Sequence, residues 1–190
     1  MIGRLIKIYI ESILFFRYWF WKIIVHFAGG KIGKRVRIYD HVKLITRKGR
    51  PLFIGDNVSI LCGVVISTSE SGRFTIGNNV YIGEYSVLSS NEEIIIEDYV
   101  LIGPHTNIVD FDHIFDDVNL KISLNKYKTK KVIIKKGAWL GCNCCILKGV
   151  TIGEGAIIGA GSVVTQDIPS YCIAVGNPAK VIKRLINDNK

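Results

Sequence analysis

The sequence has few prolines and an odd number of cysteines, and one long stretch of it lacks acidic residues. Only 4 of its 190 residues are proline, and three of its 5 cysteines crowd into positions 142–145. An odd, clustered set of this kind builds neither a disulfide framework nor a zinc site with spaced ligand pairs. We therefore expect no structural metal and a reducing, cytoplasmic environment.

Uninterrupted apolar runs are also missing from the amino-terminal 28 residues. Charged side chains break this segment at Arg4, Lys7, Glu11, Arg17 and Lys22. No run reaches the ~18–20 residues of a spanning helix, and no small-residue cleavage site follows, so a signal peptide is also disfavoured. Apolar residues at helical spacing instead predict an amphipathic helical segment over residues 1–30. An interfacial membrane helix and a helix packed on the protein or on a neighbouring subunit both fit this pattern.

Large aliphatic residues recur six positions apart, in six sets of three. The sets are Ile32, Ile38, Leu44; Ile54, Ile60, Ile66; Ile76, Ile82, Leu88; Ile96, Ile102, Ile108; Ile134, Leu140, Ile146; and Ile152, Ile158, Val164. Glycine often follows the aliphatic residue, and a small or β-branched residue lies four places after it. A period of six fits neither a 3.6-residue helix nor a two-faced strand. It fits a coil with three flat sides, each made of one short strand and a tight corner.

The interruptions of this period all fall after the third member of a set. They lie between Leu44 and Ile54, Ile66 and Ile76, Leu88 and Ile96, and Ile108 and Ile134. Insertions should therefore emerge from one corner of a prism, which a chance run of aliphatic residues in a β-sandwich would not produce. We expect an all-β domain of about six coils over residues 31–177, with an extended loop at 109–131. Residues 178–190 should form a short helix that covers the last coil.

The second half of the repeat resembles the hexapeptide-repeat acyltransferases. The resemblance is carried by Ala138–Gly141, Gly149–Gly153, Ile158–Thr165 and Gly176–Ala179, and it extends over about residues 31–184. It implies a left-handed parallel β-helix, acetyl-CoA as cosubstrate, sugar O-acetyltransferase activity and a homotrimer with coenzyme sites between neighbouring coils. The spacing alone does not give the hand, because other parallel crossovers are nearly always right-handed.

His113 lies among carboxylates at the start of the longest insertion. A neutral imidazole accepts a proton from a sugar hydroxyl, and a carboxylate on its other nitrogen fixes the tautomer. Asp110, Asp112 and Asp116 are the candidate partners, and the sequence does not choose among them. The resemblance places the catalytic histidine in this loop. His105, at a predicted corner, is interpreted as a structural residue or a substrate contact.

The resemblance also assigns a coenzyme groove. Its residues in this sequence are Trp139, Gly141, Cys142, Ala160, Thr165, Lys180 and Arg184. A backbone N–H of Gly141 or Cys142 would stabilise the developing oxyanion. Cys142 as a nucleophile is disfavoured, because nothing in the sequence marks a lowered thiol pKa and the family transfers the acyl group directly.

Charge supports a phosphate-bearing ligand. The formal net charge is +9, and residues 118–153 include eight lysines and no acidic residue. A positive surface favours the phosphates of coenzyme A, although solvated lysine runs are common. Nucleic-acid binding is disfavoured because no recognisable motif accompanies the charge.

Other functions remain in view beside an O-acetyltransferase acting on a sugar or a cell-surface polysaccharide precursor. An amino-sugar N-acetyltransferase is the nearest alternative, and a non-catalytic β-helix acting as an assembly or binding module is the alternative from another class. A zinc-dependent β-helix hydratase is disfavoured, since the four histidines lack metal-ligand spacing. The amino-terminal segment, residues 1–28, extends the expected location to the inner face of a membrane.

Overall fold

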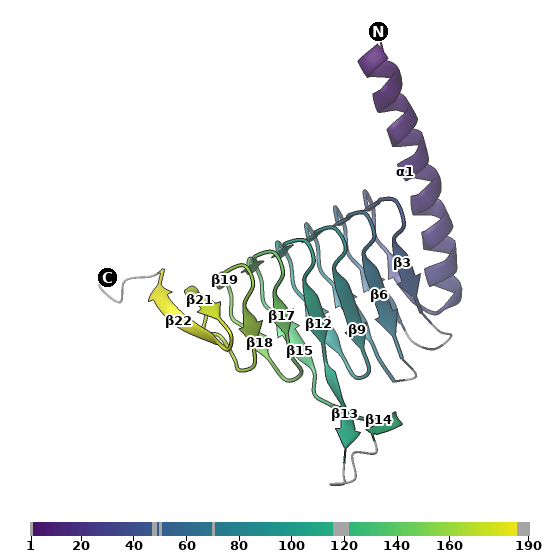
Figure 1. Ribbon diagram of the computed structural model, residues 1–190. Coiled ribbons are helices and arrows are strands. Elements are labelled where there is room, and N and C mark those ends of the chain that lie inside the picture. The colour runs from purple at the N-terminus through teal and green to yellow at the C-terminus, as the bar shows by residue number, and fades with distance from the viewer. Residues whose placement is uncertain (1, 47–48, 50, 70, 116–121, 186–190) are drawn as a thin grey trace.

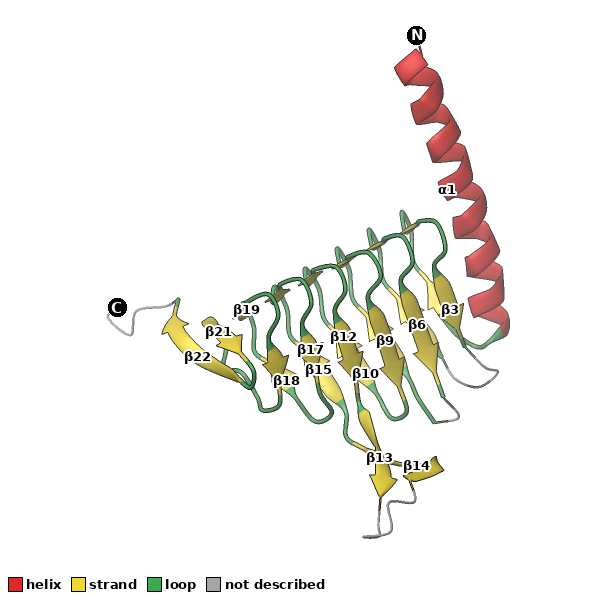
Figure 2. Cartoon of the chain, viewed as in Figure 1, coloured by secondary structure: helices red, strands yellow, loops and turns green. Residues whose placement is uncertain are grey.

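The computed structural model describes residues 2–46, 49, 51–69, 71–115 and 122–185. A long helix, α1 (Ile2–Phe27), leads into a stack of short strands that wind around a three-sided prism (Figures 1 and 2). The prism has three parallel sheets, one per side, so the predicted parallel β-helix is confirmed.

Each coil contributes one strand to each side of the prism. Sheet A holds β1 (Lys31–Ile32), β4 (Leu52–Ile54), β7 (Phe74–Ile76), β10 (Ile94–Ile96), β15 (Val132–Ile134) and β18 (Thr151–Ile152). Sheet B holds β2 (Arg37–Ile38), β5 (Ser59–Ile60), β8 (Tyr81–Ile82), β11 (Leu101–Ile102), β16 (Trp139–Leu140), β19 (Ile157–Ile158), β21 (Cys172–Gly176) and β22 (Ala179–Arg184). Sheet C holds β3 (Lys43–Ile45), β6 (Val65–Thr68), β9 (Val87–Ser90), β12 (Asn107–Val109), β17 (Cys145–Ile146) and β20 (Val163–Val164).

The aliphatic sets of the sequence stack in register inside this prism. Ile82 pairs with Ile102, and Ile102 pairs with Leu140 in the next coil. All three side chains are fully buried. Burying one such side chain contributes roughly 1.5–3 kcal/mol, so the columns account for much of the stability of the coil.

Glycine follows the aliphatic residue because successive coils approach closely at the corners. A methyl group on Gly103 would lie 2.7 Å from the backbone nitrogen of Cys142, and one on Gly55 would lie 2.6 Å from the carbonyl oxygen of Gly77. Some of the small residues that lie four positions after an aliphatic residue also form hydrogen bonds at the corner between sheets B and C. There a hydroxyl group donates to a glycine carbonyl inside the prism. Ser86 donates to Gly103 (3.2 Å).

The four insertions leave the prism at one corner, between sheets C and A, as the phase of the repeat predicts. The longest insertion contains an antiparallel hairpin of β13 (Phe111–Phe115) and β14 (Ile122–Thr129). Figure 1 shows this hairpin projecting from the prism below the strands that precede and follow it.

Helix α1 lies against the first coil, at the opposite end of the prism from the carboxyl terminus (Figure 1). Val25 is fully buried, and Tyr18 and Trp21 pack on the same core. The predicted amino-terminal helix is therefore confirmed. Within the residues that the structure describes, no helix combines the length and the apolarity needed to cross a membrane.

The predicted carboxy-terminal helix is wrong. Residues 179–184 form strand β22, which pairs antiparallel with β21. The pattern of Val181, Ile182 and Leu185 suited a helix, but β21 at the end of sheet B offers a row of unpaired backbone groups. Pairing with that edge satisfies those groups, which a helix lying across the coil would not do.

Adding a single methyl group at Gly103 should test the close approach of the coils. We expect Gly103→Ala to lower the free energy of unfolding by about 1–3 kcal/mol, because the neighbouring coil must move. Gly137→Asn is the matched control: Gly137 has a positive φ and open space around it, and Asn57 and Asn79 adopt positive φ at the same corner of earlier coils. Urea unfolding at equal protein concentration should show little change in the control. Equal losses in the two variants would contradict this packing.

Candidate active site

The hairpin β13–β14 carries His113 away from the prism on a short two-stranded sheet. Phe111 pairs with Thr129, Asp112 with Lys128, and His113 with Tyr127. Because side chains alternate between the two faces of a strand, Phe111 and His113 share one face of the hairpin and Asp112 points to the other.

The imidazole of His113 is exposed and lies in a group of three aromatic rings, His113, Phe111 and Tyr127. The ring centroids of His113 and Tyr127 are 4.8 Å apart, and those of Phe111 and Tyr127 are 5.1 Å apart. These ring contacts are tilted or edge-on, and they hold the imidazole beside the other two rings. Among the described residues, no carboxylate is hydrogen-bonded to His113.

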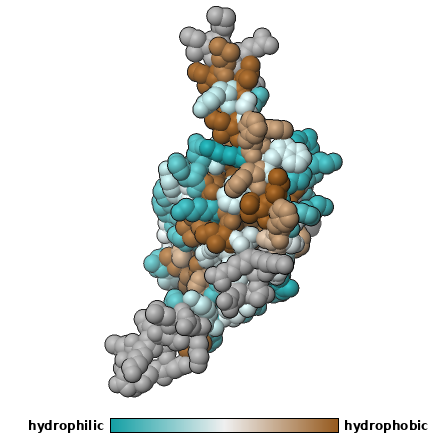
Figure 3. Space-filling view, turned by 90° about the vertical axis from the view of Figure 1, so that its right-hand side faces the viewer, coloured by the Kyte–Doolittle hydropathy of each residue, from teal (hydrophilic) through white to brown (hydrophobic). Residues whose placement is uncertain are grey.

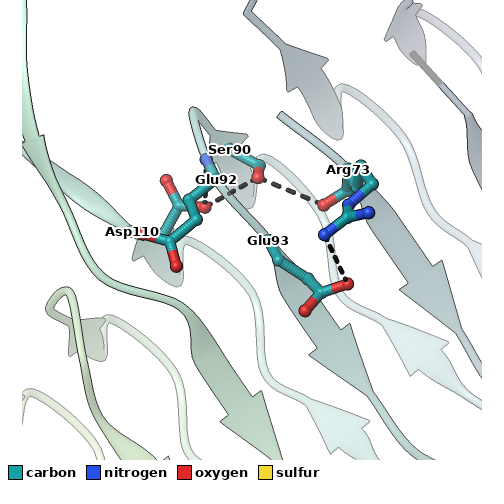
Figure 4. A network of polar contacts seen from close by, with 5 residues as sticks. All are labelled: Arg73, Ser90, Glu92, Glu93 and Asp110. Carbon is teal, nitrogen blue, oxygen red and sulfur yellow. Dashed lines mark hydrogen bonds and ion pairs between the residues drawn. The ribbon is translucent and has the colours of Figure 1, made fainter. Parts of the chain in front are cut away.

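Asp110 is fully buried at the base of the hairpin, and its carboxylate is bound to another segment (Figure 4). Oδ1 accepts a hydrogen bond from the backbone nitrogen of Asn91 (2.7 Å), while Oδ2 accepts from Ser90 Oγ (2.7 Å) and from the backbone nitrogen of Glu92 (3.0 Å). Asp110 thus closes the corner that follows β9 and fixes the point from which the hairpin departs.

The other two candidate carboxylates differ in what the structure says of them. Asp112 forms an ion pair with Lys148 of the next coil, on the opposite face of the hairpin from His113. Asp116 lies outside the described residues. The structure therefore brings Asp110 and Asp112 near the base of the hairpin but places neither against the imidazole.

A second set of contacts holds the hairpin to the following coil. The backbone N–H of Lys130 donates to the carbonyl of Asp110 (2.9 Å), and the backbone N–H of Gly149 donates to the carbonyl of Lys130 (2.8 Å). A methyl group on Gly149 would meet Lys130 Cδ at 2.4 Å. Both ends of the hairpin are thus fixed to rigid parts of the prism, which sets the direction in which His113 is carried.

Four of the predicted coenzyme residues gather around sheet B and the corner between sheets B and C. Trp139 lies on the outer face of sheet B with its indole about half exposed. Gly141 and Cys142 follow at the corner, and Ala160 occupies the same corner of the next coil, 2.6 Å from the position of a Cβ on Gly141. An exposed aromatic ring beside a tight backbone surface suits an extended, partly apolar ligand such as the pantetheine arm.

The backbone hydrogen bonds distinguish the two predicted oxyanion donors. The Gly141 nitrogen donates to the carbonyl of Ile158 (2.8 Å), so its hydrogen is used within the sheet ladder. The Cys142 nitrogen has no such backbone partner among the described residues. An oxyanion needs a donor that is fixed in place and not already bonded, and of the two only Cys142 meets this requirement.

The remaining coenzyme candidates lie further along the coil. Thr165 follows β20 at the corner between sheets C and A, while Lys180 and Arg184 lie on β22, both exposed. The guanidinium and ammonium groups on β22 extend the positive charge of the lysine-rich stretch to the end of sheet B. Together with Trp139 and the corner at Cys142, this donor set fits a ligand with an apolar arm and a phosphate-bearing end.

The neighbouring thiols do not suit nucleophilic attack. Burial raises the pKa of the Cys144 and Cys145 thiols. Cys144 Sγ contacts the carbonyl of Gly159 at 3.3 Å inside the prism. Because the thiolate is the reactive form, neither residue suits a nucleophile; Cys144 is a core residue, and Cys145 is partly buried.

His105 lies at the corner between sheets B and C, one coil before Cys142. Its ring stacks on Tyr85, with centroids 5.4 Å apart and planes 14° from parallel. His105 therefore lies on the corner side that carries Cys142 and Ala160, and not on the hairpin that carries His113.

Sheet C separates the two halves of the candidate site within one chain. His113 and Thr165 follow sheet C strands, whereas Cys142 and Ala160 precede them. A ligand in contact with both Cys142 and His113 of one chain would have to cross an outer face of the prism.

Sequence reasoning missed Tyr127 and the pairing of Lys148 with Asp112. Tyr127 lies opposite His113 only because of the register of the hairpin, which shifts between His113 and Ile114. No periodicity in the insertion encodes that register, so the sequence carried no signal for it. Lys148 was recognised only as part of a basic stretch.

Comparisons with known proteins agree with this architecture. A family model described as bacterial transferase hexapeptide (six repeats) matches residues 131–166. The chain is 36% identical over 153 residues to a probable acetyltransferase of Mycobacterium tuberculosis, covering 80% of this chain and 49% of that protein. It is 35% identical over 114 residues to a galactoside O-acetyltransferase of Lactococcus lactis, covering 60% of this chain and 53% of that protein.

A solved structure extends the likeness over most of both chains. It is a variant of the N-acyltransferase AntD from Bacillus cereus in complex with dTDP and coenzyme A, with 31% identity and a TM-score of 0.70. The match covers 80% of this chain and 83% of that one. The chain spans only about half the length of the two curated relatives named above.

Removing the Asp110 carboxylate should loosen the base of the hairpin. We expect Asp110→Ala to cost ~3 kcal/mol of stability, because three buried or partly buried donors lose a charged acceptor. Asp112→Ala is the matched control on the next residue; its ion pair is exposed and should be worth less than ~1 kcal/mol. Urea unfolding measures both. A smaller loss for Asp110→Ala than for Asp112→Ala would contradict the assignment.

Proposed function

Because the chain belongs to the hexapeptide-repeat acyltransferase family, we propose that it is an acetyl-CoA-dependent O-acetyltransferase with His113 as general base. The observation that carries the proposal is the hairpin. It presents the exposed imidazole of His113, and its two ends are fixed to the prism by Asp110 and Lys130. Loops held by a rigid scaffold are where catalytic groups concentrate.

The proposed reaction uses few groups of the chain. Acetyl-CoA supplies an activated acetyl thioester. His113 takes the proton of the acceptor hydroxyl as its oxygen attacks, and the Cys142 N–H donates to the oxygen that becomes negative. The carbon–sulfur bond then breaks, and the imidazolium of His113 returns its proton to the departing sulfur. Asp110 acts at a distance as a positioning residue. Asp112 is engaged by Lys148 on the opposite face of the hairpin, so Asp116 is the remaining candidate carboxylate for the imidazole.

The acceptor proposed is a hydroxyl group of a sugar or of a cell-surface polysaccharide precursor. The galactoside O-acetyltransferase supports a sugar hydroxyl, and the dTDP bound to AntD supports a sugar-linked acceptor. AntD is an N-acyltransferase, so an amino sugar is the second candidate. Turnover with matched hydroxyl and amino sugars distinguishes the two.

We further propose that the working form is a homotrimer. The separation of His113 from Trp139, Cys142 and Ala160 across sheet C supports a site made by two neighbouring chains. Trp139, Ala160, Lys180 and Arg184 would hold the coenzyme from one chain, and His113 would come from its neighbour. Peripheral contact through residues 1–28 would place the assembly on the inner face of a membrane.

Replacing the proposed base should remove most of the activity. We expect His113→Ala to lower kcat by about 100- to 10,000-fold, the range supplied by general bases, with little change in KM for acetyl-CoA. His41→Ala is the control, because His41 is an exposed corner residue of the first coil. Release of free CoA thiol in the presence of nucleotide sugars and oligosaccharides measures both variants. Equal turnover by His113→Ala and wild type would rule the mechanism out.

Mixing two inactive variants should test the shared site. A chain with His113→Ala and a chain with Trp139→Ala, unfolded and refolded together, should regain activity in about one quarter of the sites of a symmetric ring. Such sites combine an intact His113 with an intact Trp139 from the next chain. If each site lay within one chain, the mixture would stay as inactive as the separate variants.

A further inference from the structure

Helix α1 packs on the prism through one narrow face. Tyr18 Oη donates to the carbonyl of Gly33 (2.9 Å), and Val25 is fully buried against the first coil. Leu14 and Trp21 fall on the same side at helical spacing and are partly buried. This face, made of Leu14, Tyr18, Trp21 and Val25, covers the open end of the core.

The opposite face of the helix is apolar and exposed along its whole length. Phe16 is 72% exposed and Phe27 is 76% exposed. We call this face the outward stripe, and its residues are Leu5, Tyr9, Phe16, Phe20, Ile23 and Phe27. Single exposed apolar residues need no explanation, but a contiguous stripe of this size marks an interaction surface.

The helix is also longer than the prism needs. At ~1.5 Å per residue, its 26 residues span roughly 39 Å, and Figure 1 shows its amino-terminal part projecting past the first coil. The helix residues that line a cavity with the first coil begin at Glu11. Covering the first coil therefore does not explain the apolar side chains of residues 5–10.

The end of the prism that α1 covers is rich in basic groups. The first coil carries five of them against the single carboxylate of Asp40, which itself pairs with Arg17. They are Lys31, Lys34, Arg35, Arg37 and Lys43. A groove of about 590 Å³ between α1 and the first coil is lined by Lys22, His26, Lys31 and Lys34, with Asp56 as its acidic residue. Figure 3 shows hydrophilic side chains on both sides of the apolar helix.

We propose that α1 lies in the surface of an anionic lipid bilayer, with the outward stripe among the acyl chains and the basic groups of the first coil against phosphate headgroups. An interfacial helix has a wide apolar face rich in aromatic residues and is flanked by lysine and arginine. Viewed down the helix axis, the exposed apolar side chains cover an arc from Trp19 on one side to Ile24 on the other. This arc is wider than a coiled-coil seam. Width, aromatic content and positive charge together favour lipid over a second copy of the helix.

The geometry gives the orientation of the protein on the membrane. The outward stripe faces away from the first coil, so the axis of the prism would stand away from the bilayer. The hairpin with His113 then projects sideways from the prism, above the lipid surface. Copies packed side by side around an axis parallel to the prism would present all their α1 helices to one plane.

Vesicle flotation with the full-length protein tests this proposal. The probes are vesicles of phosphatidylcholine alone and of phosphatidylcholine and phosphatidylglycerol in equal amounts. We expect capture by the anionic vesicles and at least tenfold less by the neutral ones. The double variant Phe16→Ser, Phe20→Ser should lose capture, while Ile182→Ser, an equally exposed residue at the other end of the prism, should keep it.

A charge variant independently tests the proposed contact between the basic groups and the phosphate headgroups. Lys31→Gln with Lys34→Gln should weaken anionic capture by about fivefold for each charge removed, whereas Lys131→Gln with Lys135→Gln on a later coil should leave it unchanged. Capture that survives the phenylalanine variant overturns the proposal. So does a smaller assembly of that variant in sedimentation without lipid, which would assign the stripe to a second copy. Since flotation requires no acetyl transfer, failure here leaves the proposed enzymatic function untouched.

Discussion

The close approach of successive coils governs the architecture of the prism. Each side of the prism is a parallel ladder, and its corners are so tight that a Cβ on Gly103 would collide with the backbone of the next coil. This spacing fixes which residues point inward, where insertions leave and which backbone N–H groups remain free. The candidate site follows from those three consequences, because it combines an insertion with a free N–H group at a corner.

The hairpin that carries His113 is held at both of its ends. Asp110 is the last residue before β13, and its buried carboxylate is bonded to the corner of the preceding coil. Lys130, after β14, is bonded to the following coil through Gly149. The imidazole of His113 is thus carried on a two-stranded sheet whose ends are fixed to two neighbouring turns of the prism.

The sequence predicted the prism because a six-residue period leaves a mark in every coil, as at Ile82, Ile102 and Leu140. It failed at the carboxyl terminus, where pairing with the free edge of β21 outweighs the helical spacing of Val181 and Leu185. It also did not show which carboxylate near His113 contacts the imidazole, because that depends on which segment each side chain reaches. Asp110 is bonded to Ser90 and Asp112 to Lys148, and both partners lie on other coils.

A crystal structure of the assembled protein with bound coenzyme A would show whether two chains share each active site. We expect the coenzyme thiol beside the Cys142 corner of one chain, with the His113 imidazole of its neighbour close enough for a hydroxyl group to bridge the two. A thiol bound away from every His113, or a site completed within one chain, would contradict this expectation.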